Sequence, residues 1–206
     1  MADLDRIQKF YMAYYGRPAD TVGLDYWAET LDNVLGGNES EMVKNFGSTA
    51  QTEYQNLYGT GGIATFINNV YQNLFNRDAE TDGLNYWIGV YNDQVAAGVD
   101  PNLVKANMVA YIMDGAQGAD ADVVANKLTV SSAFTAAIDT SDEIAAYSDV
   151  NNTEGQAAAR ALLQTVTDDP ATVTSASSDI DTTIDSVTGA VSEDTETFTL
   201  TAGSDK

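Results

Sequence analysis

The sequence predicts an all-α protein, a multi-helix repeat domain of helix–turn–helix units with a short β segment at its C-terminal end. Two observations predict this fold class. Apolar residues recur at three- and four-residue steps along most of the 206-residue chain, which is the spacing of one helix face. A seventeen-residue segment also occurs twice, sixty residues apart, as Tyr11–Trp27 and Tyr71–Trp87. Such a repeat is typical of one structural unit used twice.

The helices are expected in the following order. Apolar residues from Leu4 to Tyr14 predict a first helix, which Gly16 ends. Asp20 is expected to cap a second helix that the Gly36–Gly37 pair ends. Asp100-Pro101 opens a later helix, because proline is tolerated in a first turn. Further helical patterns cover residues 42–46, 54–58, 66–74, 123–138 and 154–166.

Residues 165–197 are rich in Ser, Thr and Asp and contain no Lys or Arg. This composition alone is typical of a disordered linker. An apolar stripe from Val173 to Val191, a start signal at Asp169-Pro170 and a stop at Gly189 instead favour a solvent-exposed helix with a narrow apolar face. The alternation at Phe198 and Leu200 predicts a strand, which we expect to continue in a longer protein.

These patterns predict three parts of the chain. Residues 1–140 form a two-copy helical domain, residues 141–196 an acidic Ser/Thr-rich helical segment, and residues 197–206 the start of a β region.

The composition excludes several classes of function. There are 31 acidic and 9 basic residues, no His and no Cys, and the net charge is −22. This charge repels nucleic acids and anionic membrane surfaces. Disulfides, zinc sites and triads that need His or Cys are excluded as well. The remaining oxygen ligands suit calcium, or no chemistry at all.

No apolar run approaches the roughly 18–20 residues of a membrane span, so no membrane insertion is expected. The start "MADLDRIQKFYMAYYG" lacks the apolar core of a secretory signal peptide. The chain is therefore expected either in the cytoplasm or, as its acidity and lack of Cys favour, exported by a route that needs no N-terminal signal.

The two copies share eight identical positions: Tyr11/Tyr71, Arg17/Arg77, Ala19/Ala79, Thr21/Thr81, Gly23/Gly83, Leu24/Leu84, Tyr26/Tyr86 and Trp27/Trp87. Each copy ends one helix, turns through "GRPAD" or "NRDAE", and starts another with an acid, Asp20 or Glu80, where the helix dipole favours negative charge. Gly23 and Gly83 lie inside that helix, where Gly costs about 1 kcal/mol relative to Ala. We therefore expect each Gly to allow close approach, by an aromatic ring.

Two interpretations of this motif stay open. In the first, Tyr26-Trp27 and Tyr86-Trp87 anchor the core, and Arg17 and Arg77 fix the turn by pairing with Asp20 and Glu80 or by bonding carbonyls of the preceding helix. In the second, the aromatic rings stack on sugars and the acids bind hydroxyls or calcium.

The order of an aromatic residue, "GRPAD" and "GLDYW" resembles the bacterial DUF4214 domain, and both copies fit over roughly residues 1–140. The resemblance implies a helical module without assigned activity, found in secreted and surface-layer proteins, often beside calcium-binding RTX repeats. The second copy departs from the family at Asn76, where Gly is usual, and at Asp78, in place of a Pro-like residue, which puts its turn geometry in doubt.

The end of the chain, "FTLTAGSD", resembles the lead-in to RTX β-roll repeats, although the repeat G-G-x-G-x-D itself is absent. Together these features resemble the N-terminal part of a surface-layer protein exported by type I secretion. The resemblance implies an anchoring region that binds lipopolysaccharide O-polysaccharide on the outer face of a Gram-negative outer membrane. Its other partners would be copies of the same protein in a calcium-dependent lattice.

A calcium site is the one metal hypothesis, with Asp114, Asp120 and Asp122 in "DGAQGADAD" as candidate ligands. The EF-hand order is not met, and a plain connection between helices with Asp as N-cap is the competing interpretation. "TSDE" at 140–143 is likewise a helix start.

Three functions are carried forward. The leading one is a non-catalytic anchoring domain, and the alternative is a purely structural assembly or adhesion module. The third is an enzyme acting on cell-wall polysaccharide. A chain with 31 acids always offers carboxylate pairs and nothing singles out one of them, so no catalysis is expected.

Overall fold

The computed structural model describes residues 2–46, 52–58 and 61–195, with side chains as far as residue 189. Within these ranges the chain forms twelve helices and no strand, which confirms the all-α class. The helices are α1 (Leu4–Tyr15), α2 (Thr21–Asn33), α3 (Glu39–Phe46), α4 (Thr52–Tyr58), α5 (Ile63–Phe75), α6 (Thr81–Ala96), α7 (Pro101–Asp114), α8 (Ala119–Ala137), α9 (Ser141–Ser148), α10 (Thr153–Gln164), α11 (Pro170–Ser178) and α12 (Ile180–Thr195).

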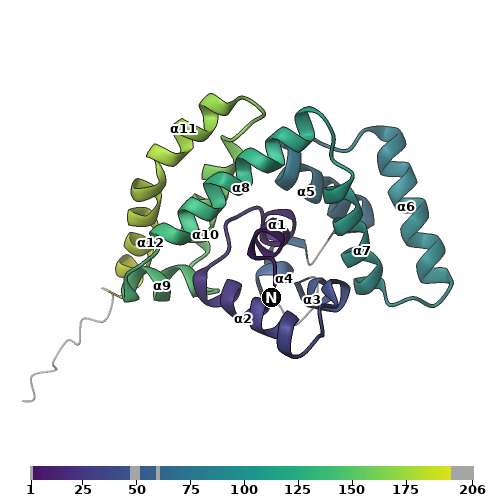
Figure 1. Ribbon diagram of the computed structural model, residues 1–206, viewed down its shortest axis with the longest axis horizontal. Coiled ribbons are helices and arrows are strands. Elements are labelled where there is room, and N and C mark those ends of the chain that lie inside the picture. The colour runs from purple at the N-terminus through teal and green to yellow at the C-terminus, as the bar shows by residue number, and fades with distance from the viewer. Residues whose placement is uncertain (1, 47–51, 59–60, 196–206) are drawn as a thin grey trace, which may run out of the picture.

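Helix α1 lies at the centre of the molecule, with other helices around it (Figure 1). It packs against α2, α4, α5, α7 and α8. Its buried side chains point in all directions: Ile7, Gln8, Phe10, Tyr11, Met12, Ala13, Tyr14 and Tyr15. A helix that is apolar on every side belongs in the interior, so the aromatic-rich first segment organises the core.

The last carbonyls of α1 are bonded by side chains from neighbouring helices. Asn73 on α5 donates its Nδ2 to the carbonyl of Ala13 at 3.0 Å. The Tyr58 hydroxyl on α4 donates to the carbonyl of Tyr14. A helix end has no intrahelical donors for these carbonyls, so the contacts let α1 end inside the protein.

Helix α8 connects this core to the C-terminal helices. It packs against α1 and α5 on one side and against α10, α11 and α12 on the other. Figure 1 shows α9 to α12 gathered on the side of α8 away from α6. Buried side chains from the first helix to Val187 belong to one hydrophobic cluster. The proposed boundary between residues 140 and 141 therefore stays a prediction from composition.

The single exposed helix predicted from Val173 to Val191 is wrong in two respects. The chain forms two helices with a break at Asp179, and Gly189 lies within α12 rather than after it. The narrow apolar face itself is confirmed. Ile184 and Val187 are buried among the neighbouring helices, whereas most other residues of α11 and α12 up to residue 189 are exposed.

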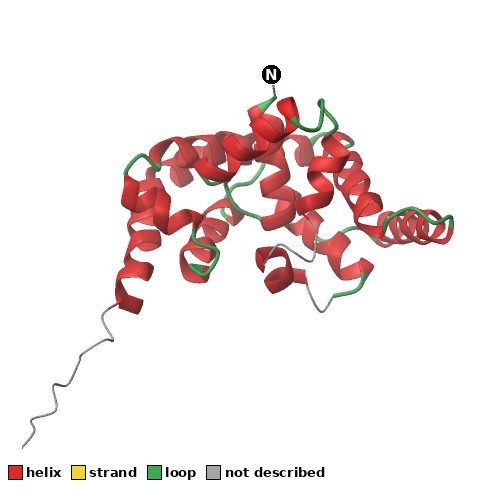
Figure 2. Ribbon diagram, turned by 90° about the horizontal axis from the view of Figure 1, so that it is seen from below, coloured by secondary structure: helices red, strands yellow, loops and turns green. Residues whose placement is uncertain are grey.

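Helix α6, the second helix of the second copy, lies at the edge of the molecule. It packs on α5 and α7, and none of its residues is fully buried. Figures 1 and 2 both show it projecting beyond the other helices.

The predicted start signals are confirmed. Asp20, Asp100 and Asp169 each accept a backbone N–H of the following helix. Thr140 forms a capping box with Glu143, as "TSDE" predicts. The strand and the RTX-like lead-in predicted at residues 197–206 lie outside the described residues. Within the described ranges, no helix combines the length and apolar character needed to cross a membrane.

Candidate functional site

The two copies of the repeated segment form the same turn, from α1 to α2 and from α5 to α6. Gly16 and Asn76 end the first helix of each copy in the left-handed conformation, with φ of 66° and 57°. Asp20 and Glu80 then precede the second helix in an extended conformation, both with ψ of 150°. The departure at Asn76 leaves the turn unchanged, because asparagine tolerates positive φ better than most residues.

Arg17 is buried within the first copy. Its Nε and Nη2 atoms donate to the two carboxylate oxygens of Glu53 on α4, both at 2.7 Å. Its Nη1 donates to the carbonyl of Pro18 at 2.9 Å and lies 3.6 Å from a carboxylate oxygen of Asp20. The guanidinium also lies 5.1–5.7 Å from the ring centres of Tyr11, Tyr15 and Tyr147. The predicted pair with Asp20 exists, but the two-bonded partner is Glu53.

Glu53 links two arginines. One of its oxygens also accepts from Nη1 of Arg160 on α10 at 3.2 Å. Burial lowers the pKa of Arg17, but the Glu53 carboxylate, Tyr147 and Asp20 outweigh burial and raise it well above its usual value. Arg17 is therefore a permanent cation whose charge the surrounding protein balances.

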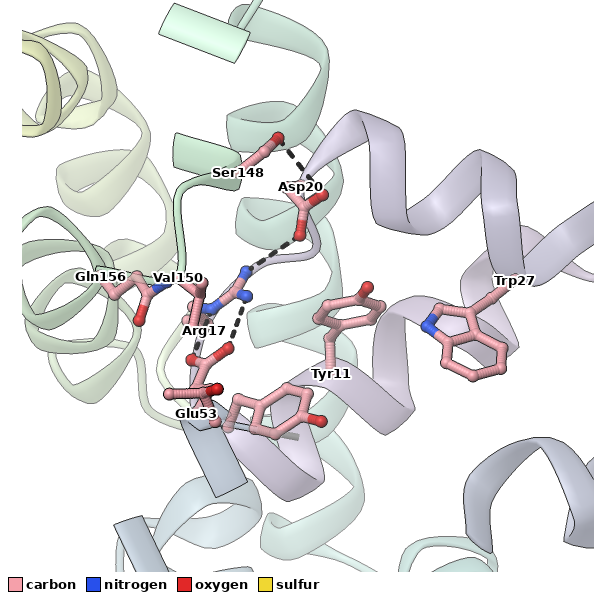
Figure 3. A pocket seen from close by; sticks show the side chains of 10 residues that line it. Tyr11, Arg17, Asp20, Trp27, Glu53, Ser148, Val150 and Gln156 are labelled. Carbon is pink, nitrogen blue, oxygen red and sulfur yellow. Dashed lines mark hydrogen bonds and ion pairs between the residues drawn. The ribbon is translucent and has the colours of Figure 1, made fainter. Parts of the chain in front are cut away.

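A cavity of about 230 Å³ opens beside this cluster (Figure 3). Side chains from α1, α2, α4, α9, α10 and the connecting loops line it. They are Tyr11, Tyr15, Arg17, Asp20, Trp27, Thr52, Glu53, Ser148, Val150 and Gln156. Residues far apart in the sequence thus build one concave surface of aromatic rings, carboxylates and hydroxyls.

Two aromatic residues of this cavity carry hydrogen-bond donors, the Tyr11 hydroxyl and the Trp27 indole N–H. Neither the Tyr11 hydroxyl nor the Trp27 indole N–H bonds to another group in the described part of the chain. In the second copy the equivalent Trp87 indole donates to the Tyr71 hydroxyl at 3.2 Å. Figure 3 shows the Trp27 indole nitrogen on the side of its ring nearest to Tyr11. Burial raises the pKa of Tyr11 far above its usual value, so its hydroxyl keeps its proton.

Because Gly23 has no side chain, the Tyr11 hydroxyl can lie close to the backbone of α2. A Cβ atom at position 23 would overlap this hydroxyl and lie within 3.0 Å of both Asp20 carboxylate oxygens. The predicted close approach of an aromatic ring is therefore confirmed in the first copy. At Gly83 the corresponding distance to the Tyr71 hydroxyl is 3.8 Å, an ordinary contact.

Arg77 repeats the arrangement of Arg17 nearer to the surface. Its Nε and Nη2 donate to the carboxylate of Asp120 at 3.1 and 2.7 Å, and its Nη1 donates to the carbonyl of Asp78 at 3.2 Å. Its side chain is 39% exposed, against 5% for Arg17. The predicted partner Glu80 forms no ion pair with Arg77 among the described residues.

The aromatic pairs of the motif divide between core and surface. Trp27 and Trp87 pack against the hydrophobic core, as the structural interpretation predicts. Tyr26 and Tyr86 are 58% and 63% exposed, so the prediction that they anchor the core is wrong. Each tyrosine ring contacts the neighbouring indole edge-on, with centroids 4.9 and 5.0 Å apart.

The three proposed calcium ligands do not converge. Asp114 pairs with Arg6, and Asp120 pairs with Arg77. Asp122 lies exposed in the first turn of α8, whose N-cap is Gly118 rather than an Asp. Among the residues described, no three Asp, Glu, His or Cys side chains are placed to hold a metal ion. A calcium requirement therefore stays a prediction without assigned ligands.

Sequence patterns alone missed half of the residues that line the cavity. Glu53, Ser148 and Gln156 belong to no repeated motif, and Glu53 lies thirty-six residues from Arg17. The one available signal is the repeated arginine, which needs a carboxylate when it is buried.

Comparison with protein families adds one match. Residues 45–100 match the family described as "Domain of unknown function (DUF4214)". A DUF4214 domain therefore lies at residues 45–100. This domain contains the second copy and contributes Thr52 and Glu53 to the cavity. The first copy lies outside the match. No curated protein and no solved structure matches the chain.

Proposed function

We propose that the protein is a non-catalytic anchoring domain of a secreted surface-layer protein, and that it binds lipopolysaccharide O-polysaccharide at the cell surface. The observation that carries the proposal is the cavity in which Tyr11 and Trp27 present aromatic surface and donors that have no partner among the described residues. Rings combined with a few polar groups are typical of small-molecule sites, and sugars offer both C–H faces and hydroxyls.

The proposal assigns no reaction to the cavity. Its two carboxylates, Asp20 and Glu53, both face Arg17, and Glu53 also bonds Arg160. These contacts hold the acids in the protein's own ion pairs. A glycosidase instead directs one carboxyl group to the leaving oxygen and another to the reacting carbon or water.

The proposed location is the outer face of a Gram-negative outer membrane, reached by type I secretion. The net charge of −22 and the lack of cysteine support an acidic, extracellular surface. Calcium would act in the RTX-like part of such a protein and in its lattice.

The proposal is tested with the purified chain and smooth lipopolysaccharide, in a pull-down with and without chelator. Binding is expected in both conditions, because the described residues offer no calcium cluster. Rough lipopolysaccharide, which lacks O-polysaccharide, is the control and should not bind. Absence of binding to the smooth form in both conditions would refute the proposal.

Assembly between copies of the chain is the second candidate function. The observation that favours it is α6, which projects from the body and exposes Tyr86. Concentration-dependent oligomers in light scattering, abolished by Tyr86→Ser and unaffected by Tyr26→Ser, would support it. A monomer at all concentrations would exclude it for this part of the protein.

A further inference from the structure

The Arg17 guanidinium, which lines the cavity, is poorly placed to bind an acidic ligand. All three guanidinium nitrogens of Arg17 already face protein oxygens, those of Glu53, Pro18 and Asp20. A ligand carboxylate or phosphate would have to displace Glu53. That displacement would leave a carboxylate that is only 11% exposed beside Arg160 alone. Removing one partner of a buried ion pair is strongly unfavourable.

The charge around the cavity gives no further attraction to anions. Arg17 and Arg160 are balanced by Asp20 and Glu53 in the same cluster. Beyond this cluster the whole chain carries −22 charges, which repel an approaching anionic polysaccharide. An uncharged ligand meets neither penalty.

The hydrogen-bond donors of Tyr11 and Trp27 suit the hydroxyl groups of a sugar. Tyr11 as a whole is 4% exposed and lines the cavity, and its hydroxyl lacks a partner in the described part of the chain, as does the Trp27 indole N–H. In the second copy the equivalent side chains bond each other instead. The volume of about 230 Å³ is below the roughly 300–1,000 Å³ of sites for drug-sized ligands. The cavity therefore suits one ring rather than an oligosaccharide.

We propose that this cavity binds one uncharged, hydroxyl-bearing sugar unit of the surface glycan, with hydrogen bonds from Tyr11 and Trp27, and that it rejects acidic sugars. The inference rests on the proposed function and specifies the ligand of the same protein. Arg17 and Glu53 are positioning residues that hold the rings around the cavity, since their bonds are made to each other.

The experiment compares two sets of delipidated O-polysaccharides by isothermal titration calorimetry. One set has neutral repeating units and the other contains uronic acid or phosphate. The protein is the full chain as wild type, Tyr11→Phe, Trp27→Phe and the matched control Tyr71→Phe. At least one neutral polymer should bind, with an affinity that is unchanged between 50 and 300 mM NaCl. Loss of one hydrogen bond of about 1.4 kcal/mol corresponds to a tenfold weaker Kd.

Tyr11→Phe and Trp27→Phe are therefore expected to weaken binding about tenfold, and Tyr71→Phe less than twofold. Thermal melts show whether each variant is folded, and because Tyr→Phe removes a single oxygen atom, Tyr11→Phe should melt close to the wild type. Tighter binding of acidic than neutral polymers would overturn the inference and leave the proposed function standing. Neutral binding that is equal in wild type and Tyr11→Phe would overturn the assignment of this cavity. Absence of binding to every polymer would refute the proposed function itself.

Discussion

The two copies of the motif have the same backbone turn and different surroundings. In the first, Arg17 is buried between Glu53 and Asp20, and the hydroxyl of Tyr11 has no hydrogen-bond partner among the described residues. In the second, Arg77 is partly exposed beside Asp120, and Trp87 bonds Tyr71. The repeated residues thus specify a turn, whereas the helices packed over it decide whether a cavity forms. In the first copy, side chains from α4, α9 and α10 complete the lining of the cavity.

The largest expected difference between the copies lies in their ion pairs. Glu53→Ala would leave Arg17 and Arg160 buried without this carboxylate and should lower the free energy of unfolding by about 3–5 kcal/mol. The matched Asp120→Ala removes a partner of the more exposed Arg77 and should cost less than about 1 kcal/mol. Urea denaturation measures both values. Equal losses in the two variants would contradict the contrast between buried and exposed arginine.

A second difference concerns the side chains that donate hydrogen bonds to the last carbonyls of α1 and α5. The carbonyl of Ala13 accepts from the neutral amide of Asn73, whereas the equivalent carbonyl of Asn73 accepts from the buried Lys127 ammonium at 2.6 Å. Burial lowers the pKa of Lys127 from 10.5 to about 7. Between these values the unfolded chain holds a proton that the folded chain has released. The free energy of unfolding should therefore rise with pH in this window.

The rise expected between pH 7 and 9 is about 1–3 kcal/mol, measured by urea denaturation at several pH values. In Lys127→Met this component should vanish. Above about pH 10 the trend should reverse, because the pKa values of buried tyrosines such as Tyr11 and Tyr58 are raised on folding. A wild-type slope that persists in Lys127→Met would assign the effect to other groups.

The third difference concerns the paired glycines Gly23 and Gly83, at which substitution by alanine should change the stability in opposite directions. Gly23→Ala would force its Cβ into the Tyr11 hydroxyl and should destabilise the protein by about 1–3 kcal/mol. Gly83→Ala meets only an ordinary contact and should stabilise α6 by about 0.5–1 kcal/mol. Thermal unfolding of both variants measures the two effects. Stabilisation by Gly23→Ala would show that Tyr11 can move away, which would also remove the basis for a preformed cavity.

The sequence predicted those features that depend on neighbouring residues. Helical spacing and the caps at Asp20 and Asp100 follow from side chains a few positions apart. The close approach at Gly23 involves Tyr11, twelve positions away in the same repeated segment. The eight shared positions predicted a common helix–turn–helix unit, and the turn persists even at Asn76, where its geometry had been in doubt.

The features that the sequence did not predict depend on distant packing. The carboxylates that bond Arg17 and Arg77 come from thirty-six and forty-three residues away, and no local pattern points to them. No Gly or Pro precedes the break at Asp179, so the sequence there carries no signal that a helix ends. One of the two interpretations of the motif placed Tyr26 in the core together with Trp27, but a hydroxyl-bearing ring is also stable at the surface.

The bond between Asn73 and Ala13 has a consequence for symmetry. Residues 73 and 13 occupy the same place in the two copies, so the copies touch each other through equivalent positions. The contact is not reciprocal, because the carbonyl of Asn73 accepts from Lys127 and not from residue 13. The pairing of α1 with α5 thus joins the two copies asymmetrically within one chain. A protein with a single copy of this motif would lack this contact, and the last carbonyls of its first helix would need another donor.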